Sequence, residues 1–299
     1  MRRVIAAVAA LVAAGALAGC AGLPPGTDGN LTNNWPAMAE AKLTIPTAGT
    51  CYLSHYDRVG YGDLGVVDCS QTHYVETAYV GEFTGADAQR TNPPAADSPA
   101  LPGAYAQCQK GAVDYLGGDW HTGMLWLGLV VPSDGAWRGG GRWFRCDLVH
   151  YSDALDDAIV DKGVLKGDLS GPRTSAYSCI ATTENPDQHI VTAAPADCSA
   201  PHQAEFAGLY TAADVPYPTD DAARKKMGEN GCENVVAKFL GYSSASQWNN
   251  QAVGLWWLGF SEDQWKLGDR TTQCFAYAYT NSHQFLGSVK GIKNQAPKS

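Results

Sequence analysis

The feature that most constrains this chain is a nine-residue pattern that occurs twice, each time within a frame of four cysteines. Residues 68–76 and 197–205 both read Asp-Cys-Ser-x-x-His-x-x-Glu. A single match of Cys and His at short spacing can arise by chance, but two matches in the same cysteine frame indicate an internal duplication. The sequence therefore predicts two homologous repeats arranged in tandem.

Further landmarks recur in the same order in the two repeats. The pairs are Cys51 with Cys179, Cys108 with Cys232, Trp126-Leu-Gly128 with Trp257-Leu-Gly259, Trp137 with Trp265, Arg142 with Arg270, Cys146 with Cys274, and a closing Gly-x-x-Lys-Gly at 163–167 and 287–291. From these landmarks we expect a signal peptide at 1–19, a lipidated N-terminus and flexible stalk at 20–48, repeat 1 at 49–167, a linker at 168–174 and repeat 2 at 175–293.

The first twenty residues predict export and lipidation. Two arginines are followed by an apolar run from Val4 to Leu17, which is too short for a comfortable membrane span and has the flanks of a secretory signal. Leu17-Ala-Gly-Cys20 resembles a bacterial lipobox, and by that resemblance Cys20 carries acyl chains such as palmitate. We expect a protein anchored by lipid at the extracytoplasmic face of the cell membrane.

Cysteine usage fits that compartment. Nine cysteines are present, and removing Cys20 leaves eight, four in each repeat. An even set in an exported chain predicts disulfides, whereas zinc is disfavoured because no Cys-x-x-Cys pair occurs. We expect no metal and no cofactor. By matching strand to strand and turn to helix, we predict Cys51–Cys146, Cys69–Cys108, Cys179–Cys274 and Cys198–Cys232.

Local patterns predict an α+β fold. Residues 74–83 and 203–210 favour strands because they are rich in β-branched and aromatic residues. Residues 104–116 and 222–240 have helical spacing, the second with an expected break near Gly228 to Gly231. Further strands are expected at 124–131, 142–151, 255–260 and 270–279, with Ser133 and Ser261 as helix N-caps. Each repeat should be a mostly antiparallel sheet with one main helix.

These residues resemble the septum formation family of bacterial envelope proteins. The resemblance rests on a Cys-Ser-x-x-His-x-x-Glu turn, a later cysteine in a helix, and Trp-x-x-Gly-x-Arg-x-x-x-Cys, found here at 137–146 and 265–274. Repeat 2 also has the family's Gly-Asp-Arg at 268–270, where repeat 1 has Gly140-Gly-Arg142. The family name implies a link to cell division, and it brings no established reaction.

Two sets of residues are candidates for function. His73 with Glu76, and His202 with Glu205, could each be a general base with its carboxylate, or a metal site. The alternative is a structural role, because residues three apart on a strand point to opposite faces. Trp137 with Arg142 and Trp265 with Arg270 could stack on a sugar or peptide, although core packing is favoured. Trp120-His121 and Trp248 lie in loops that we expect to be exposed.

Charge limits the partners. The chain has 21 Lys+Arg and 30 Asp+Glu, a net charge of -9, and no basic run, which argues against nucleic acid. We expect the membrane, reached through the lipid anchor, and envelope or division proteins or cell-wall glycan as partners. The sequence favours a non-enzymatic binding or scaffold protein of the envelope associated with septum formation. The alternative is an envelope hydrolase that uses His73 or His202 as general base.

Overall fold

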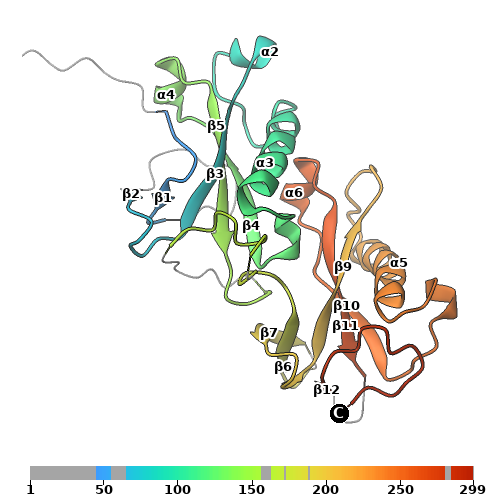
Figure 1. The fold of residues 1–299 in the computed structure, drawn as a ribbon. Coiled ribbons are helices and arrows are strands. Elements are labelled where there is room, and N and C mark those ends of the chain that lie inside the picture. The colour runs from blue at the N-terminus through green and yellow to red at the C-terminus, as the bar shows by residue number, and fades with distance from the viewer. Residues whose placement is uncertain are drawn as a thin grey trace, which may run out of the picture. The chain divides into compact units, whose positions relative to one another are not determined.

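The computed structural model describes residues 45–54, 65–155, 163–171, 173–187, 189–279 and 284–298, all within one compact unit. The predicted signal peptide, Cys20 and the stalk up to residue 44 lie outside the described residues. Figure 1 shows the elements in chain order. The predicted division into two separate domains remains a prediction, and "repeat" below denotes a stretch of sequence.

Repeat 1 forms a five-stranded antiparallel sheet in the order β2-β1-β3-β5-β4. The strands are β1 (Cys51–Tyr52), β2 (Val66–Val67), β3 (Val75–Glu82), β4 (Leu125–Val130) and β5 (Trp143–His150). The predicted strand at 74–83 is therefore confirmed as β3. Its first four residues are all buried, because one face of this strand packs on the helix and the other on a second apolar cluster.

Repeat 2 forms a second sheet with the same arrangement, β7-β6-β9-β11-β10. Its strands are β6 (Cys179–Glu184), β7 (Ile190–Ala196), β9 (Ala204–Thr211), β10 (Val253–Trp257) and β11 (Thr271–Ala278). A separate two-stranded sheet pairs β8 (Pro201–His202) with β12 (Phe285–Leu286). Even the β-bulge is shared, since β3 and β9 each shift register against their partner by one residue, at Ala78 and at Ala207.

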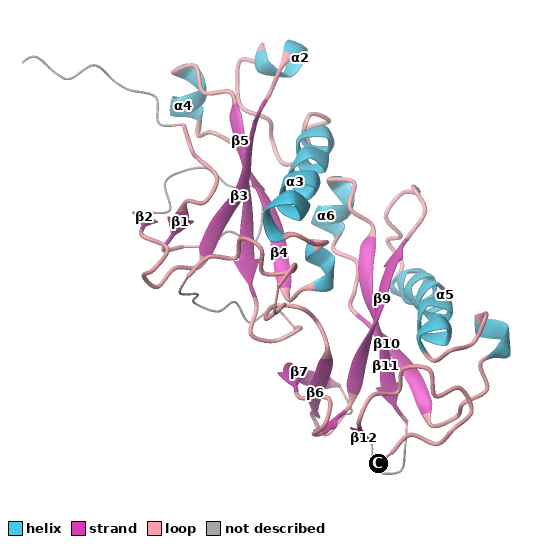
Figure 2. Ribbon diagram, in the orientation of Figure 1, coloured by secondary structure: helices cyan, strands magenta, loops and turns pink. Residues whose placement is uncertain are grey.

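One long helix lies on each sheet, α3 (Leu101–Leu116) and α5 (Asp221–Phe239) (Figure 2). The expected break in the second helix is wrong. Gly228 and Gly231 are tolerated because the rings of Trp257 and Tyr210 press onto them, where a Cβ would come within 2.5 Å and 2.1 Å of ring carbons. Short elements complete the chain: α2 (Gly85–Ala88), η1 (Trp120–Thr122), α4 (Asp134–Arg138), η2 (Ala245–Gln247) and α6 (Glu262–Lys266).

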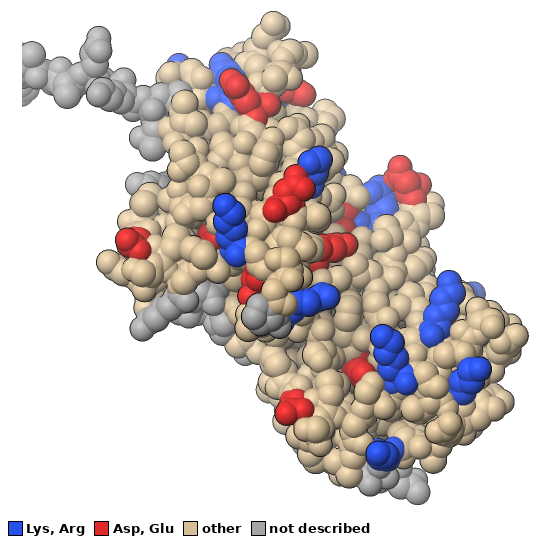
Figure 3. Space-filling view, viewed as in Figure 1, with Lys and Arg blue, Asp and Glu red and all other residues tan. Residues whose placement is uncertain are grey.

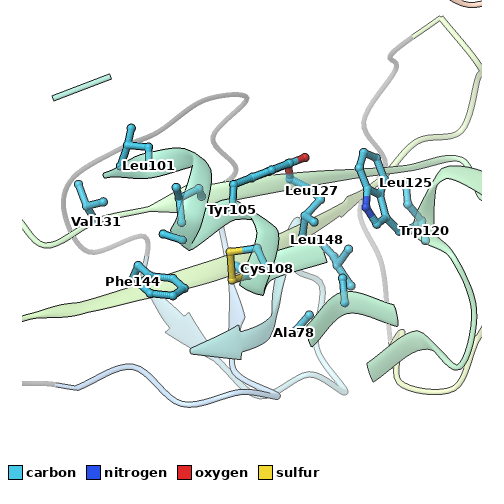
Figure 4. Close-up of a cluster of buried hydrophobic side chains, with 14 of the residues drawn as sticks. Ala78, Leu101, Tyr105, Cys108, Trp120, Leu125, Leu127, Val131, Phe144 and Leu148 are labelled. Carbon is cyan, nitrogen blue, oxygen red and sulfur yellow. A yellow bond between two sulfur atoms is a disulfide. The ribbon is translucent and has the colours of Figure 1, made fainter. Parts of the chain in front are cut away.

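The core of repeat 1 lies between α3 and its sheet. Figure 4 shows Leu101, Tyr105 and Cys108 of the helix facing Leu127, Phe144 and Leu148 of the strands. All six are at most 1% exposed. Fully burying side chains of this kind stabilises the fold by roughly 1.5 to 3 kcal/mol each. The α+β class with antiparallel sheets is thus confirmed.

The expectation of disulfides is confirmed, but the predicted pairing is wrong. The bonds are Cys51–Cys69, Cys108–Cys146, Cys179–Cys198 and Cys232–Cys274. The helix packs over the central strands, so its cysteine faces β5 or β11 and not the Asp-Cys-Ser turn. That turn instead returns beside the first strand of its repeat, with Cα atoms 5.3 Å apart between Cys51 and Cys69.

The sheet register also corrects one part of the alignment between repeats. Cys146 lies opposite Leu129 of β4, whereas the equivalent Cys274 lies opposite Trp257 of β10. Leu129 is therefore the counterpart of Trp257, and Trp126 is the counterpart of Gly254. The predicted match of Trp126-Leu-Gly128 with Trp257-Leu-Gly259 is three residues out of register, because the two short sequences resemble each other by chance.

Within the part of the chain that the structure describes, no helix combines the length and the apolar character needed to cross a bilayer.

Candidate functional site

The glutamate of each nine-residue motif holds the closing Gly-x-x-Lys-Gly segment of its own repeat. Glu76 accepts a hydrogen bond from the backbone N–H of Leu165 at 2.8 Å, and Glu205 accepts one from Val289 at 2.7 Å. Leu165 and Val289 occupy the same place in the closing segment. Both carboxylates are buried, at 1% and 8% exposure. The motif thus joins β3 of repeat 1, or β9 of repeat 2, to the closing segment of the same repeat.

The second oxygen of each carboxylate accepts a hydrogen bond from a hydroxyl, and the residue that donates it stands at different positions in the two repeats. In repeat 1 the donor is Tyr115 of α3, and burial together with Glu76 raises the pKa of that phenol well above its usual range. Repeat 2 has Phe239 at that place and lacks the hydroxyl. Ser288 instead donates to Glu205 Oε1 at 2.5 Å, and its counterpart in repeat 1 is Val164. A lost donor is replaced by a new one on a neighbouring segment.

The closing segment also caps the main helix. Gly167 and Leu169 donate to the carbonyls of Tyr115 and Leu116, at 2.9 and 3.0 Å. In repeat 2, Gly291 and Lys293 donate to Phe239 and Leu240 at 2.9 and 2.8 Å. These bonds satisfy carbonyls that a helix C-terminus otherwise leaves open.

The motif histidines are buried beside these carboxylates. His73 and His202 are at most 1% exposed, and their Nδ1 atoms lie 2.9 and 2.8 Å from the carbonyl oxygens of Gln71 and Ala200. A carbonyl only accepts, so each Nδ1 carries the proton and donates. The Nε2 atoms have no hydrogen-bond partner among the described residues.

A metal does not fit these clusters in their oxidised state. In each repeat a cysteine sulfur, a histidine nitrogen and a glutamate oxygen lie within 4.8 Å of one another, from Cys51, His73 and Glu76 or from Cys179, His202 and Glu205. The sulfurs belong to disulfides, whereas a metal needs the thiolate. The carboxylates are already engaged by backbone and hydroxyl donors.

The tryptophan–arginine pairs are packed into the fold. Trp137 and Trp265 are 1% and 4% exposed, and their Nε1 atoms donate to the carbonyls of Arg90 and Val215 at 2.8 and 2.9 Å. Arg142 lies over the Trp137 ring at 4.1 Å, and Arg270 lies 5.2 Å from the centre of the Trp265 ring. In both repeats the indole belongs to the short helix before the last long strand, α4 or α6, and ties that helix to a distant backbone carbonyl.

A histidine that the sequence analysis expected in an exposed loop joins the two repeats. His121 is 7% exposed, and its imidazole lies between two carboxylates, with Nδ1 2.7 Å from Asp119 and Nε2 2.9 Å from Asp269 of repeat 2. Burial alone would lower the pKa of His121, but the two carboxylates outweigh it and raise the pKa to about 9. His121 is therefore an imidazolium at neutral pH, balanced by its neighbours.

A cavity of about 500 Å³ lies beside this histidine. Its wall combines the start of β4 with residues of repeat 2 around α6, and its aromatic members are Trp120, Trp126, Tyr151, Tyr177 and Phe260. Sequence reasoning missed this site because its walls come from loops and strand ends of both repeats. The one available signal was Asp269, the acidic residue of Gly-Asp-Arg that repeat 1 lacks.

Repeat 2 has a more open hollow at the start of its own edge strand. It measures about 400 Å³ and includes Glu229, Glu233, Trp248, Asn250 and Tyr279. Tyr279 is the counterpart of Tyr151, since each follows the residue opposite the start of the edge strand. The two hollows therefore occupy corresponding places in the two repeats. The hollow of repeat 1 is also lined by residues of repeat 2, whereas the hollow of repeat 2 is lined by its own repeat.

Comparison with known proteins gives one match. A family model described as "Septum formation" matches residues 48–274, which is more than half of the chain. No curated protein and no solved structure matches.

Proposed function

This chain belongs to the septum formation family, and we propose on that basis that it is a lipid-anchored, non-enzymatic binding or scaffold protein of the bacterial envelope that acts in septum formation. Its two repeats would be two tandem domains of common origin. The anchor would be Cys20, at the extracytoplasmic face of the membrane. Its partners would be envelope or division proteins, or cell-wall glycan.

The observation that carries a binding role is the state of the two His–Glu motifs. Their carboxylates hold the closing segments, and their histidines are buried against backbone carbonyls. A general base must reach a substrate proton within hydrogen-bond distance, directly or through one water. Side chains at most 8% exposed and tied to the backbone support a structural role. A surface that remains available for binding is the cavity of about 500 Å³ beside the start of β4.

Charge on the surface fits a role that does not depend on anionic partners. Figure 3 shows basic and acidic side chains scattered over one face, with uncharged residues covering most of it. The net charge of -9 would repel anionic lipid headgroups, so the proposed membrane attachment relies on the acyl chains.

Crosslinking in intact cells followed by purification of the protein from the envelope tests the proposed role. Division or wall-synthesis proteins should be enriched among the crosslinked neighbours. A Cys20→Ala variant should move to the soluble or secreted fraction and lose those neighbours. Full membrane retention of that variant would refute the lipid anchor.

The hydrolase alternative is tested at the motif histidines. His73→Ala with His202→Ala should lower the free energy of unfolding by roughly 1 to 3 kcal/mol per repeat, the cost of a buried donor or acceptor left unpaired. Thermal melts of the single and double variants, beside a complementation assay for division, measure this. A double variant that melts normally yet fails to complement would favour the enzyme.

A further inference from the structure

We propose that the cavity between the start of β4 and the α6 region binds a neutral oligosaccharide. This inference rests on the proposed binding function and assigns it a site and a ligand class. The cavity holds about 500 Å³, a volume typical of sites for small ligands. Both repeats supply its walls, so it exists only in the intact chain.

Aromatic rings line the cavity from both repeats. Trp126 comes from β4, Tyr151 follows β5, and Tyr177 and Phe260 come from repeat 2. The indole of Trp126 lies against Gly128, where a Cβ would come within 2.3 Å of its ring. Fixed rings offer flat apolar faces, and the C–H face of a pyranose ring stacks on such surfaces. Trp126 also borders a smaller, mostly apolar cavity of about 210 Å³ along β4, so the binding groove continues beside the strand.

The uncharged polar side chains of the wall are amides and hydroxyls, those of Gln264, Gln273, Ser261 and Thr271, beside the phenols of Tyr151 and Tyr177. An amide offers two donors and an acceptor in one plane, which suits adjacent sugar hydroxyls that both give and take hydrogen bonds.

Charge excludes the main alternatives. The one cationic group in the wall, His121, is already paired with two carboxylates, Asp119 and Asp269, at 2.7 and 2.9 Å. No lysine or arginine lines this cavity, and the lysine of the smaller cavity, Lys266, already pairs with Glu262 at 2.9 Å, so a phosphate or carboxylate ligand would find no free counter-charge. The one acidic wall residue, Asp263, pairs with Lys266 at 3.8 Å. A cationic ligand is therefore not favoured either.

The experiment titrates the purified full-length protein, in a detergent without a sugar headgroup, with three soluble probes. These are tetra-N-acetylchitotetraose, which is neutral, its fully deacetylated form, which is cationic, and tetra-alanine. Tryptophan fluorescence and calorimetry report binding. We expect saturable binding of the neutral tetrasaccharide, and at least roughly tenfold weaker binding of the other two probes, the equivalent of 1.4 kcal/mol.

Three variants locate the site. Trp126→Ala and Gln264→Leu should each weaken binding about tenfold, and Trp126→Phe should retain most of it because a flat ring remains. Tyr279→Ala is the matched control, because Tyr279 is the counterpart of Tyr151 in the hollow of repeat 2, and it should bind as the parent does. Circular dichroism checks that each variant is folded. If Trp126→Ala unfolds, Gln264→Leu decides.

The proposal is overturned if the folded parent shows no saturable binding of the neutral tetrasaccharide, if tetra-alanine binds better, or if Tyr279→Ala weakens binding as much as Gln264→Leu does. Failure here is distinguishable from failure of the proposed function. A protein that still crosslinks to division proteins but binds no saccharide retains the envelope role and loses this site.

Discussion

The two repeats share a backbone but carry different side chains at equivalent positions of the sheet, a buried ion pair in repeat 1 and an aromatic pair of one buried and one half-buried ring in repeat 2. In repeat 1, Asp147 accepts from Thr77 Oγ1 at 2.7 Å and from Arg145 Nε at 2.9 Å. Arg145 lies over the ring of Tyr52 at 4.1 Å, and both charged residues are 3% exposed. Burial raises the pKa of Asp147 against the opposing pull of Arg145 and Thr77.

In repeat 2 the corresponding residues are Phe206, Gln273 and Phe275. Phe206 lies opposite Phe275 across the same strand pair in which Thr77 lies opposite Asp147. The two phenylalanine rings pack edge to face with centres 5.6 Å apart. The bulged strand, the register and the disulfide are retained while an ion pair becomes an aromatic pair. The fold therefore depends on filling this place and not on the charge within it.

Removing the buried ion pair of repeat 1 should have the largest effect on the free energy of unfolding. Asp147→Ala leaves Arg145 buried without its carboxylate and should cost about 3 to 5 kcal/mol in the free energy of unfolding. The triple change Thr77→Phe, Arg145→Gln, Asp147→Phe copies repeat 2 and should cost little, because buried ion pairs are often replaced by apolar residues without loss. Urea unfolding measures both. A triple variant as unstable as Asp147→Ala would contradict the interchangeability of the two solutions.

His121, which joins the two repeats through Asp269, should make the free energy of unfolding depend on pH. Asn250, in the hollow of repeat 2, should contribute equally at every pH. The pKa of His121 in the fold, about 9, exceeds its ordinary value of 6.5. Its contribution is therefore complete below pH 6.5 and is lost as pH rises to about 9, a loss of about 3 kcal/mol. Asp269→Asn should flatten this part of the curve of unfolding free energy against pH. Asn250→Ala in repeat 2 should lower the curve at every pH without changing its slope.

The hydroxyl that donates to the motif glutamate comes from Tyr115 in repeat 1 and from Ser288 in repeat 2. Exchanging these donors should change the free energy of unfolding by a smaller amount. Tyr115→Phe gives repeat 1 the residue of repeat 2 and removes a hydrogen bond to a buried carboxylate, which should cost about 1.5 to 3 kcal/mol. Val164 is 60% exposed, so Val164→Ser alone should be nearly neutral. Combined with Tyr115→Phe it should recover part of the loss. Guanidinium melts of the four proteins give the coupling energy, and a value of zero would show that the two donors are unrelated.

Removing the serine N-cap of α4 or of α6 should have the smallest effect on stability, and the effect should be the same in the two repeats. Ser133 and Ser261 cap α4 and α6 by accepting from Ala136 N and Gln264 N, at 3.2 and 3.3 Å. Replacing either serine by alanine should cost roughly 1 kcal/mol. Thermal melts measure the pair. A clear difference between the two variants would mean that α6 is also held by its contacts around the cavity.

Much of this architecture could be predicted from the sequence because duplication supplies two samples of each pattern. Strand β3, helix α3 and the serine caps follow from local propensity and spacing. Disulfide pairing could not be predicted in this way, because it depends on which face of the sheet the helix covers. The break expected near Gly228 failed because the rings that occupy the space above the glycines, from Trp257 and Tyr210, come from other parts of the chain.

The site was harder to predict than the fold. Spacing singled out His73 and His202, whose partners are backbone atoms and whose neighbours are buried. The histidine at the junction, His121, stands in no repeated pattern, and its partner Asp269 is 148 residues away. The contact between the repeats is made by residues that differ between them, such as His121 and Asp269. Aligning one repeat with the other therefore does not identify these residues.

The closing segments have a consequence for the order in which the chain can fold. Leu165 reaches back 89 residues to Glu76, and Val289 reaches back 84 residues to Glu205. A chain that emerges from its N-terminus can form the strands and helix of a repeat before this last segment arrives. Contacts between such distant residues form slowly because the loop between them must close first. A fragment cut at the end of β5 would therefore keep every strand of its sheet and still lack the bonds that close the repeat.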